Sequence, residues 1–293
     1  MPHGSARVGN VEVVALCDGV VGSSSPIEES FPGGAPGTWD DVRARYPGTV
    51  SDAGHWLLHV HAFALRSAGR TILVDTGFGP ATAPAFAWAG KAGRLPVELA
   101  EAGIQAPEVD TVLVTHVHDD HIGWTVFEGG QTLHFPNARH VVNRADWDWM
   151  EGSDDPEDVE IFTKLLKPLE DLGALELSDD RVVVTDELAL VHAPGHTPGH
   201  QVVLIESEGE RALLSGDAFN HPAQVPQPTL ASSSDADPQL AVRTRTELLE
   251  RAEREGRLVV PSHFPEPFGR VVTEDGRRAF RASGVGGGPG SAR

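Results

Sequence analysis

The sequence predicts an α/β fold in which two β-rich layers are faced by helices. Short apolar, β-branched runs alternate with helical segments in the order strands, helix, strand, helix, strands, helix, strand. Several strand-like runs also end in His or Asp, as expected when one edge of a sheet carries a site. At 293 residues the chain is long enough for two average domains, but α/β folds of this size are often one unit. We therefore expect a single domain over residues 1–282.

The first third of the chain predicts strands separated by a long irregular segment. Residues 11–21, VEVVALCDGVV, are typical of a strand or hairpin, and the runs at 59–66 and 71–77 predict a hairpin with its turn at 67–70. Residues 22–54 contain SSSP, FPGGAPG and YPG, which is too much Gly, Pro and Ser for regular structure. We expect this N-terminal arm either to cover a binding site or to form a dimer contact.

The middle of the chain predicts two helices and two strands. Pro96 and Gly103 suit the beginning and end of a helix over 96–102. A short buried strand is expected at 111–115 and another at 138–143. Asp154 and Asp155 precede a helix expected over 156–172.

The last third predicts successive strands, one long helix and a final strand. The strands are expected at 181–184, 188–194, 201–206 and 211–217. Asp237 and Pro238 begin an amphipathic helix that runs to Glu255 and ends at Gly256, and a strand at 258–263 follows it. Residues 283–293 are rich in Gly and predict a disordered tail.

Composition narrows the function classes. The net charge of −20 disfavours nucleic acid, because polyanions are repelled at long range. The sequence has no apolar run long enough for a membrane span, and its N-terminus shows no secretion pattern, so we expect a cytoplasmic protein without a membrane partner. The single Cys17 excludes an internal disulfide and a thiolate-rich zinc cluster. Any metal must therefore be held by His and carboxylate side chains.

The pattern H-x-H-x-D-H directly follows the apolar run TVLVT. It places His116, His118, Asp120 and His121 within six residues of a strand end. Four ligands are too many for one turn to direct at a single ion, but a tight loop can direct them at two adjacent ions. We therefore expect a two-metal site.

Three further ligands are expected singly from the ends of other strands. His196 lies in HAPGHTPGH, Asp217 in LLSGDA, and His263 ends LVVPSH. Imidazole and carboxylate ligands suit zinc, with Mn, Fe or Co also possible. Such ions lower the pKa of a bound water from about 15.7 to about 7, which predicts hydroxide as the nucleophile and Asp120 as both ligand and proton carrier.

Five motifs together resemble the metallo-β-lactamase superfamily over roughly residues 11–272: VDTG with Asp75, T-H-x-H-x-D-H, G-H-T-P-G-H, S-G-D and P-S-H. The resemblance implies a four-layer αβ/βα sandwich with two mixed β-sheets flanked by helices. It further implies that His116, His118 and His196 hold one ion. Asp120, His121 and His263 would hold the second ion, and Asp217 would bridge both as a catalytic residue.

Other residues near these motifs are candidates for supporting roles. Asp75 and Thr115 resemble positions that orient ligand imidazoles, although Asp75 could instead serve a turn. His200 is expected to be structural, and His221 to point into the pocket or to pack in the core. The candidates for an aromatic pocket wall are Trp124, Trp147, Trp149 and Phe219, although aromatic residues of this kind more often pack in the core.

The resemblance is closest to the branch containing N-acyl homoserine lactonases, pyridoxolactonase and methyl parathion hydrolase. Familiar zinc β-lactamases carry cysteine where this chain has Asp217, which disfavours antibiotic hydrolysis. We expect a small-molecule lactone or related ester as substrate, and a homodimer through the arm. The alternatives are an arylester or phosphotriester hydrolase, a glyoxalase-II-like thioesterase, and a mononuclear iron persulfide dioxygenase. The basic residues with which a glyoxalase-II-like enzyme binds glutathione near its C-terminus are not evident here beyond Arg277 and Arg278.

Overall fold

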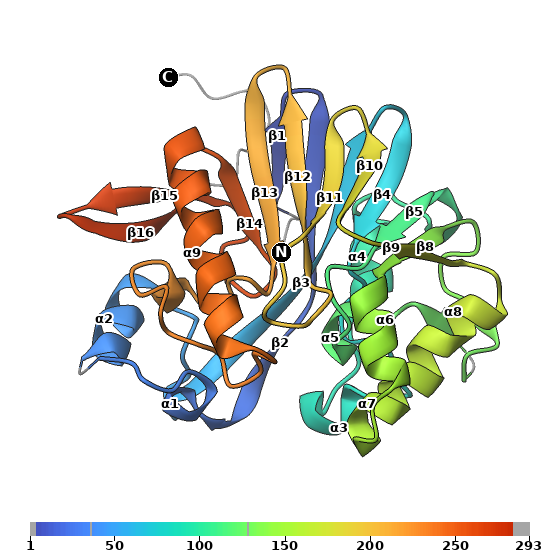
Figure 1. Cartoon of the computed structure of the whole chain (residues 1–293), viewed down its shortest axis with the longest axis horizontal. Helices are drawn as coiled ribbons and strands as arrows, with labels where there is room; N and C mark the ends of the chain where they lie inside the picture. Colours follow the sequence, from blue (N-terminus) through green and yellow to red (C-terminus); the bar gives the residue numbers. More distant parts are fainter. Residues whose placement is uncertain (1–3, 36, 128, 284–293) are drawn as a thin grey trace.

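The computed structural model describes residues 4–35, 37–127 and 129–283. Within these ranges two seven-stranded sheets lie face to face, and helices cover the outer face of each sheet (Figure 1). Both sheets contain parallel and antiparallel pairs. The prediction of a four-layer αβ/βα sandwich with mixed sheets is therefore confirmed.

The first sheet has the strand order β1-β2-β3-β4-β5-β8-β9. Strands β1 to β4 pair antiparallel, whereas β4, β5, β8 and β9 run parallel. The bounds are β1 Ser5–Val8, β2 Val11–Pro26, β3 His55–Ser67, β4 Arg70–Val74, β5 Thr111–Leu113, β8 Arg139–Asn143 and β9 Leu175–Ser178. A separate two-stranded ribbon consists of β6 Val126–Phe127 and β7 Thr132–Leu133.

The second sheet has the order β10-β11-β12-β13-β14-β15-β16. Its pairs are antiparallel except β13 with β14, so β11, β13 and β14 all run in one direction. The bounds are β10 Arg181–Thr185, β11 Leu188–His192, β12 Gln201–Ser207, β13 Glu210–Gly216, β14 Leu258–Pro261, β15 Gly269–Glu274 and β16 Arg277–Ala282.

Helices cover both outer faces and fill the connections. The α-helices are α1 Ile27–Ser30, α2 Thr38–Arg45, α3 Phe86–Ala89, α4 Leu95–Glu101, α5 Asp119–Ile122, α6 Arg144–Glu151, α7 Pro156–Ile161, α8 Lys167–Asp171 and α9 Pro238–Glu255. Shorter turns are η1 Ala106–Glu108, the π-helical η2 Phe162–Leu166 and η3 Pro222–Gln224. Helices α4, α6 and α8 share an apolar cluster with the first sheet, and α9 shares one with the second.

The core between the sheets explains why most strands are readable in the sequence. Phe63, Leu65, Val141, Leu190 and Leu214 all lie in one buried cluster shared by both sheets. Strands covered on both faces must be apolar on both faces, so they appear as continuous runs. Each fully buried side chain of this kind contributes roughly 1.5–3 kcal/mol.

Two local predictions are confirmed in detail. Strands β3 and β4 form the expected hairpin, and its turn residue Ala68 has φ 52°. Helix α9 has the predicted bounds. At its start the Asp237 side chain caps the helix by accepting a hydrogen bond from Leu240 N at 2.9 Å. Gly256 ends the helix with φ 60°, a conformation that favours glycine.

The prediction of an irregular arm over 22–54 is wrong in part. Strand β2 continues through Pro26, and the arm then forms α1 and α2. The Gly and Pro residues separate these short elements. The elements are held in place because Phe31 and Trp39 are buried against Ala223 and Leu230 of the loop after β13. The arm is thus packed onto the second half of the chain.

Other boundaries also differ from the prediction. The helix expected over 156–172 is interrupted by the π-helical turn η2, and α6, β9 and the β15–β16 hairpin were not predicted. The tail at 283–293 lies outside the described residues except for Ser283. In the described residues no helix is both long and apolar enough to span a membrane. The single domain, the homodimer and the cytoplasmic location stay predictions.

Candidate metal centre

The predicted ligands come from strand ends that meet at one edge of the sandwich. His116 and His118 lie in the loop after β5, and Asp120 and His121 lie in α5. The remaining three follow β11, β13 and β14, whose shared direction brings their carboxyl ends to the same edge: His196, Asp217 and His263. The structure brings all seven residues together in three overlapping groups of potential metal ligands.

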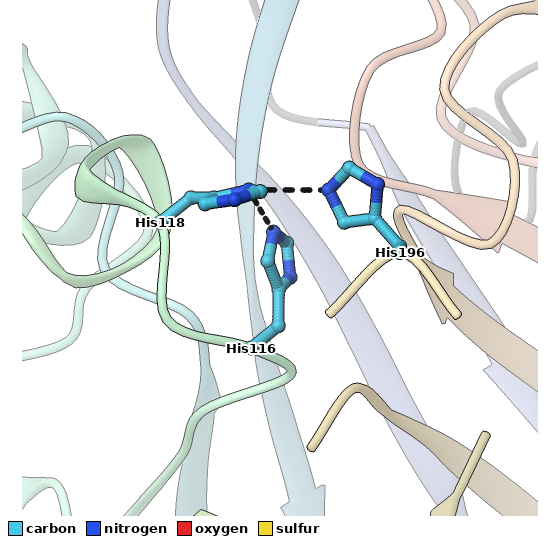
Figure 2. A group of neighbouring side chains, drawn as sticks. All are labelled: His116, His118 and His196. Atoms are coloured by element: carbon cyan, nitrogen blue, oxygen red, sulfur yellow. Dashed lines mark hydrogen bonds between the residues drawn. The ribbon is translucent and has the colours of Figure 1, made fainter. Parts of the chain in front are cut away.

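The first group consists of three imidazoles. His118 Nδ1 lies 3.0 Å from His116 Nε2 and 3.1 Å from His196 Nε2, and the three rings point toward one another (Figure 2). The far nitrogen of His116 contacts Thr115 Oγ1 at 3.1 Å, and that of His196 contacts Asp235 Oδ1 at 2.9 Å. These partners accept the Nδ1 protons and leave the Nε2 lone pairs directed at a common point.

Burial keeps two of these imidazoles, His116 and His118, in the form that binds metals. It lowers the pKa of His116 well below its ordinary value, and it lowers the pKa of His118 to about 3. Neutral imidazole is the metal-binding form. The single Nδ1 of His118 cannot satisfy two facing lone pairs, so the donor set fits a cation.

The second group contains Asp120, His121 and His263. The Nε2 atoms of the two histidines lie 3.2 Å apart, and Asp120 Oδ2 lies 3.6 Å from His121 Nε2 and 3.5 Å from His263 Nε2. The Nδ1 of His121 contacts Asp75 Oδ2 at 2.9 Å, and that of His263 contacts the His59 carbonyl at 2.8 Å. Each ring is therefore oriented by its Nδ1, with Nε2 directed into the site.

Charge differs between the two groups. Burial lowers the pKa of His121, but the carboxylates of Asp120, Asp217 and Asp75 outweigh it and hold that pKa well above its ordinary value. The pKa of His263 is likewise raised against burial by Asp217 and Asp120. Protons on these two imidazoles balance the negative charge of the nearby carboxylates. A divalent cation that displaces these protons would balance the same charge. The second group also fits a cation.

Asp217 lies between the two groups. Its carboxylate oxygens are 3.4 Å from His196 Nε2 and 3.4 Å from His121 Nε2, so it reaches an imidazole of each group. Asn220 Nδ2 donates to Asp217 Oδ2 at 2.7 Å, while the Asp217 backbone N–H donates to His200 Nε2 at 3.0 Å. Among the described residues nothing donates a hydrogen bond to its buried Oδ1. This arrangement suits a carboxylate shared by two ions.

A cavity of about 660 Å³ opens beside the cluster. Its wall includes five of the seven residues, the apolar side chains of Val21, Trp56, Leu58 and Trp88, and serines of the arm and of the loop before α9. The Trp56 ring also stands edge-on to His263 at 6.0 Å. The arm therefore contributes to the cavity wall through Gly22, Ser23, Ser24 and Ser30.

The aromatic wall was predicted from the wrong residues. Trp124 and Trp147 lie in the core outside the first sheet, where Trp149 packs against the same cluster, and Phe219 is buried against α9. His221 is enclosed by the rings of Phe31, Trp39 and Trp56. In the described part of the chain none of these five predicted residues lines the cavity. Contacts within the core hold them instead.

Comparison with known proteins agrees with this geometry. Residues 55–263, which include all seven potential ligands, match the family described as the metallo-beta-lactamase superfamily. The chain belongs to this superfamily. Its members bind metal ions, and the side-chain groups described above are the residues of this chain that could do so.

Relatives and solved structures within the superfamily are distant. A probable metallo-hydrolase of Mycobacterium tuberculosis is 27% identical over 205 residues, covering 59% of this chain and 61% of that protein. N-acyl homoserine lactonase AttM of Azorhizobium caulinodans is 31% identical over 178 residues, covering 57% and 62%. The chain thus matches less than two thirds of either relative's length. The solved structure of AidC, a dizinc quorum-quenching lactonase, has a TM-score of 0.80 at 20% identity, covering 97% of this chain and 98% of that chain, which shows the shared fold.

Residues behind the ligands complete the superfamily site. Asp75 accepts hydrogen bonds from Thr115 N at 2.7 Å and Thr115 Oγ1 at 2.8 Å, besides its contact with His121. It adopts φ 59°, which is uncommon for a residue other than glycine. Asp75 and Thr115 follow the neighbouring parallel strands β4 and β5, and Asp75 thereby fixes both His121 and the loop that carries His116.

Replacing Asp75 with alanine is expected to weaken metal binding about 10–100-fold, the usual cost of losing a carboxylate that orients a ligand histidine. Competition with a chromophoric chelator measures this change. Asp110→Ala is the matched control, because the exposed Asp110 side chain accepts a backbone hydrogen bond from Thr71 beside the same strands and belongs to none of the potential ligand groups. Equal metal affinity in both variants would contradict the orienting role.

Three supporting residues were not predicted from the sequence. Asp235 holds His196, Arg245 of α9 lies 3.3 Å from Asp235 Oδ2, and Asn220 holds Asp217. Asn220 stands three residues after Asp217, and this closeness was the only available signal. Asp235 is 39 residues from its histidine, so no local pattern indicates the pair.

Proposed function

We propose that this chain opens a lactone or cleaves a related carboxylic ester of a small uncharged molecule, using two divalent metal ions. The observation that carries the proposal is the convergence of seven His and Asp side chains beside a cavity of about 660 Å³, with five of them in its wall. Such a volume is ordinary for small-molecule sites. The similarity to AttM and AidC, both lactonases, supports the same class of substrate.

In this proposal His116, His118 and His196 hold one ion, and Asp120, His121 and His263 hold the other. Asp217 is shared between them. Two divalent ions held there, with zinc the expected metal, would supply a water that ionises near neutral pH and a Lewis acid for the carbonyl oxygen. The second group of ligands favours this dinuclear reading over a mononuclear iron dioxygenase.

The chain's own residues orient the reactants and handle protons. Asp120 lies in the cavity wall with its carboxylate beside His121 and His263. From there it can accept the proton released by the attacking water and return it to the leaving alkoxide. Asn220 fixes the orientation of Asp217 through its amide, so the shared carboxylate needs no rearrangement during the reaction.

The cavity lining supports an uncharged substrate. In the part of the chain that the structure describes, no lysine or arginine lines this cavity. A β-lactam carboxylate or the glutathione moiety of a thioester would find no basic side chain among these lining residues. Arg277 and Arg278, considered for glutathione, line a different groove beside α2 and the β15–β16 hairpin. An arylester or a phosphotriester has no net negative charge and uses the same chemistry, so both belong in the test.

Activity should be measured on metal-loaded protein against lactones, aryl esters, phosphotriesters, lactoylglutathione and a chromogenic β-lactam, with metal content determined on the same sample. We expect the highest kcat/KM on a lactone or ester, with two ions per chain. A chelator should abolish turnover, and added zinc should restore it. One iron per chain with oxygen consumption, or a preference for the anionic substrates, would contradict the proposal.

A further inference from the structure

We propose that Trp88 determines substrate specificity by binding an uncharged apolar group, such as an alkyl chain or aryl ring, and that Asp119 positions Trp88 for this task. The identity of the reaction rests on the proposed function, whereas the binding of an apolar group by Trp88 does not depend on turnover. Trp88 is an exposed tryptophan whose polar edge is fixed by a hydrogen bond.

Trp88 combines exposure with a place in the cavity wall. It lies on the short helix α3, and 41% of its surface is exposed. It lines the same cavity as the potential ligands His118, Asp120 and Asp217. A large apolar surface left open beside a catalytic cluster is typical of a ligand-binding contact.

Two contacts hold the indole in place. Trp88 Nε1 donates a hydrogen bond to Asp119 Oδ2 at 2.8 Å. The ring of the fully buried Phe78 packs against it at 6.5 Å, tilted by 55°, and Phe78 N donates in turn to the buried Asp18 at 2.8 Å. An immobilised aromatic ring binds a ligand at low entropic cost, because its side-chain rotamer is already fixed.

Asp119 connects the indole to the metal-binding loop. It is the first residue of α5 and stands between His118 and Asp120 in the sequence. Its carboxyl group is largely buried, and its hydrogen bond to Trp88 joins α3 to this loop. The position of the indole is thereby fixed relative to the side chains that would hold the metals. Asp119 acts as a positioning residue in this account.

The surroundings of Trp88 favour an apolar, uncharged group. Among the described lining residues outside the set of potential metal ligands, the acidic ones are Asp119 and Glu157, and none is basic. An anionic substituent therefore gains no ion pair with a side chain there, whereas Trp56 and Leu58 in the wall offer apolar contact. A neutral substrate can therefore place its reacting carbonyl at the cluster and its hydrocarbon part against Trp88.

The test uses metal-loaded protein and non-hydrolysable N-acyl amino-lactams with short to long acyl chains. Calorimetry gives their Kd, and the corresponding lactones give KM and kcat. In the parent protein we expect Kd to fall as the chain lengthens. Trp88→Ala should raise Kd for the long-chain lactams and KM for the long-chain lactones by about 10–100-fold, the amount that one buried aromatic contact supplies. Short-chain affinity, kcat and metal content should stay nearly constant.

Matched variants separate this role from general disruption. Phe86→Ala removes another exposed ring from the same helix, at 37% exposure, that does not line the cavity, and should leave Kd unchanged. Asp119→Asn keeps an oxygen acceptor for Trp88 Nε1 and should retain the chain-length preference. Asp119→Leu should lose that preference while two ions remain bound. Trp88→Gln repeats the main test with a longer side chain if the alanine variant unfolds.

The outcomes distinguish the two proposals. Chain-length-dependent lactam binding that Trp88→Ala abolishes, together with no lactone or ester turnover, would overturn the proposed reaction but support the apolar subsite. Equal effects of Trp88→Ala and Phe86→Ala, or no effect of either, would overturn the subsite. Tighter binding of ligands with an anionic chain end would overturn the assignment of an uncharged group.

Discussion

Replacing Asp217 with alanine is expected to remove both metal ions and to lower kcat/KM by far more than about 10²-fold. Losing a residue that only orients a metal ligand already lowers metal affinity or activity about 10–100-fold. Asp217 itself lies within 3.0–3.9 Å of imidazole nitrogens from both groups. Without it, each group retains only three side-chain donors. Metal content by mass spectrometry and steady-state kinetics on the proposed substrates measure the two effects.

Glu157→Gln is the matched control for the loss of a cavity carboxylate. Glu157 lines the same cavity but belongs to none of the potential ligand groups, so the control should retain two ions and nearly full kcat. An Asp217→Ala protein that keeps two ions and turns over normally would refute the shared-ligand assignment. Loss of one ion alone would show that Asp217 serves a single group.

Replacing Arg245 with methionine is expected to lower the free energy of unfolding by about 3–5 kcal/mol, the usual cost of breaking a buried ion pair. The Arg245 side chain is fully buried and faces the fully buried Asp235 at 3.3 Å. It also donates to the carbonyls of Ala218, Pro228 and Leu230. Methionine fills much of the same volume but leaves these acceptors and the carboxylate without their donor.

Arg251→Met provides the matched control on the same helix. Arg251 pairs with Glu255 at the surface, with 39% of its side chain exposed, so its loss should cost less than about 1 kcal/mol. Urea unfolding followed by tryptophan fluorescence compares the two variants. The double variant Arg245→Met, Asp235→Leu should be less destabilised than the sum of its single changes, because no uncompensated charge remains. Equal stability of the Arg245→Met and Arg251→Met proteins would contradict the role of the buried pair.

Much of the potential metal cluster could be predicted because its signal is local. His116, His118, Asp120 and His121 come from one short segment, and the other three residues each follow an apolar strand. Strand direction then brings these ends to one edge. The contacts of Asp235 and Arg245 depend on the path of the loop before α9, which no spacing rule describes.

The walls of the cavity were harder to predict, because exposure cannot be inferred from residue type. Trp124 is as apolar as Trp88, yet it is buried in the core, with its Nε1 donating to Asp18. The fold shows a similar division. Strands buried on both faces appear as apolar runs, whereas the β15–β16 hairpin exposes residues such as Arg270 and Arg281 and was missed.

Each group of potential ligands draws on both sheets. His116 and His118 follow a strand of the first sheet, while His196 follows a strand of the second. In the other group Asp120 and His121 follow a strand of the first sheet, and His263 follows a strand of the second. An ion bound by such a group fastens the two halves of the sandwich together, much as a cross-link would. Ligand binding to the native state alone adds about 2.7 kcal/mol of stability when free metal exceeds Kd a hundredfold. Metal supply would then govern the lifetime of the folded protein as well as its catalysis.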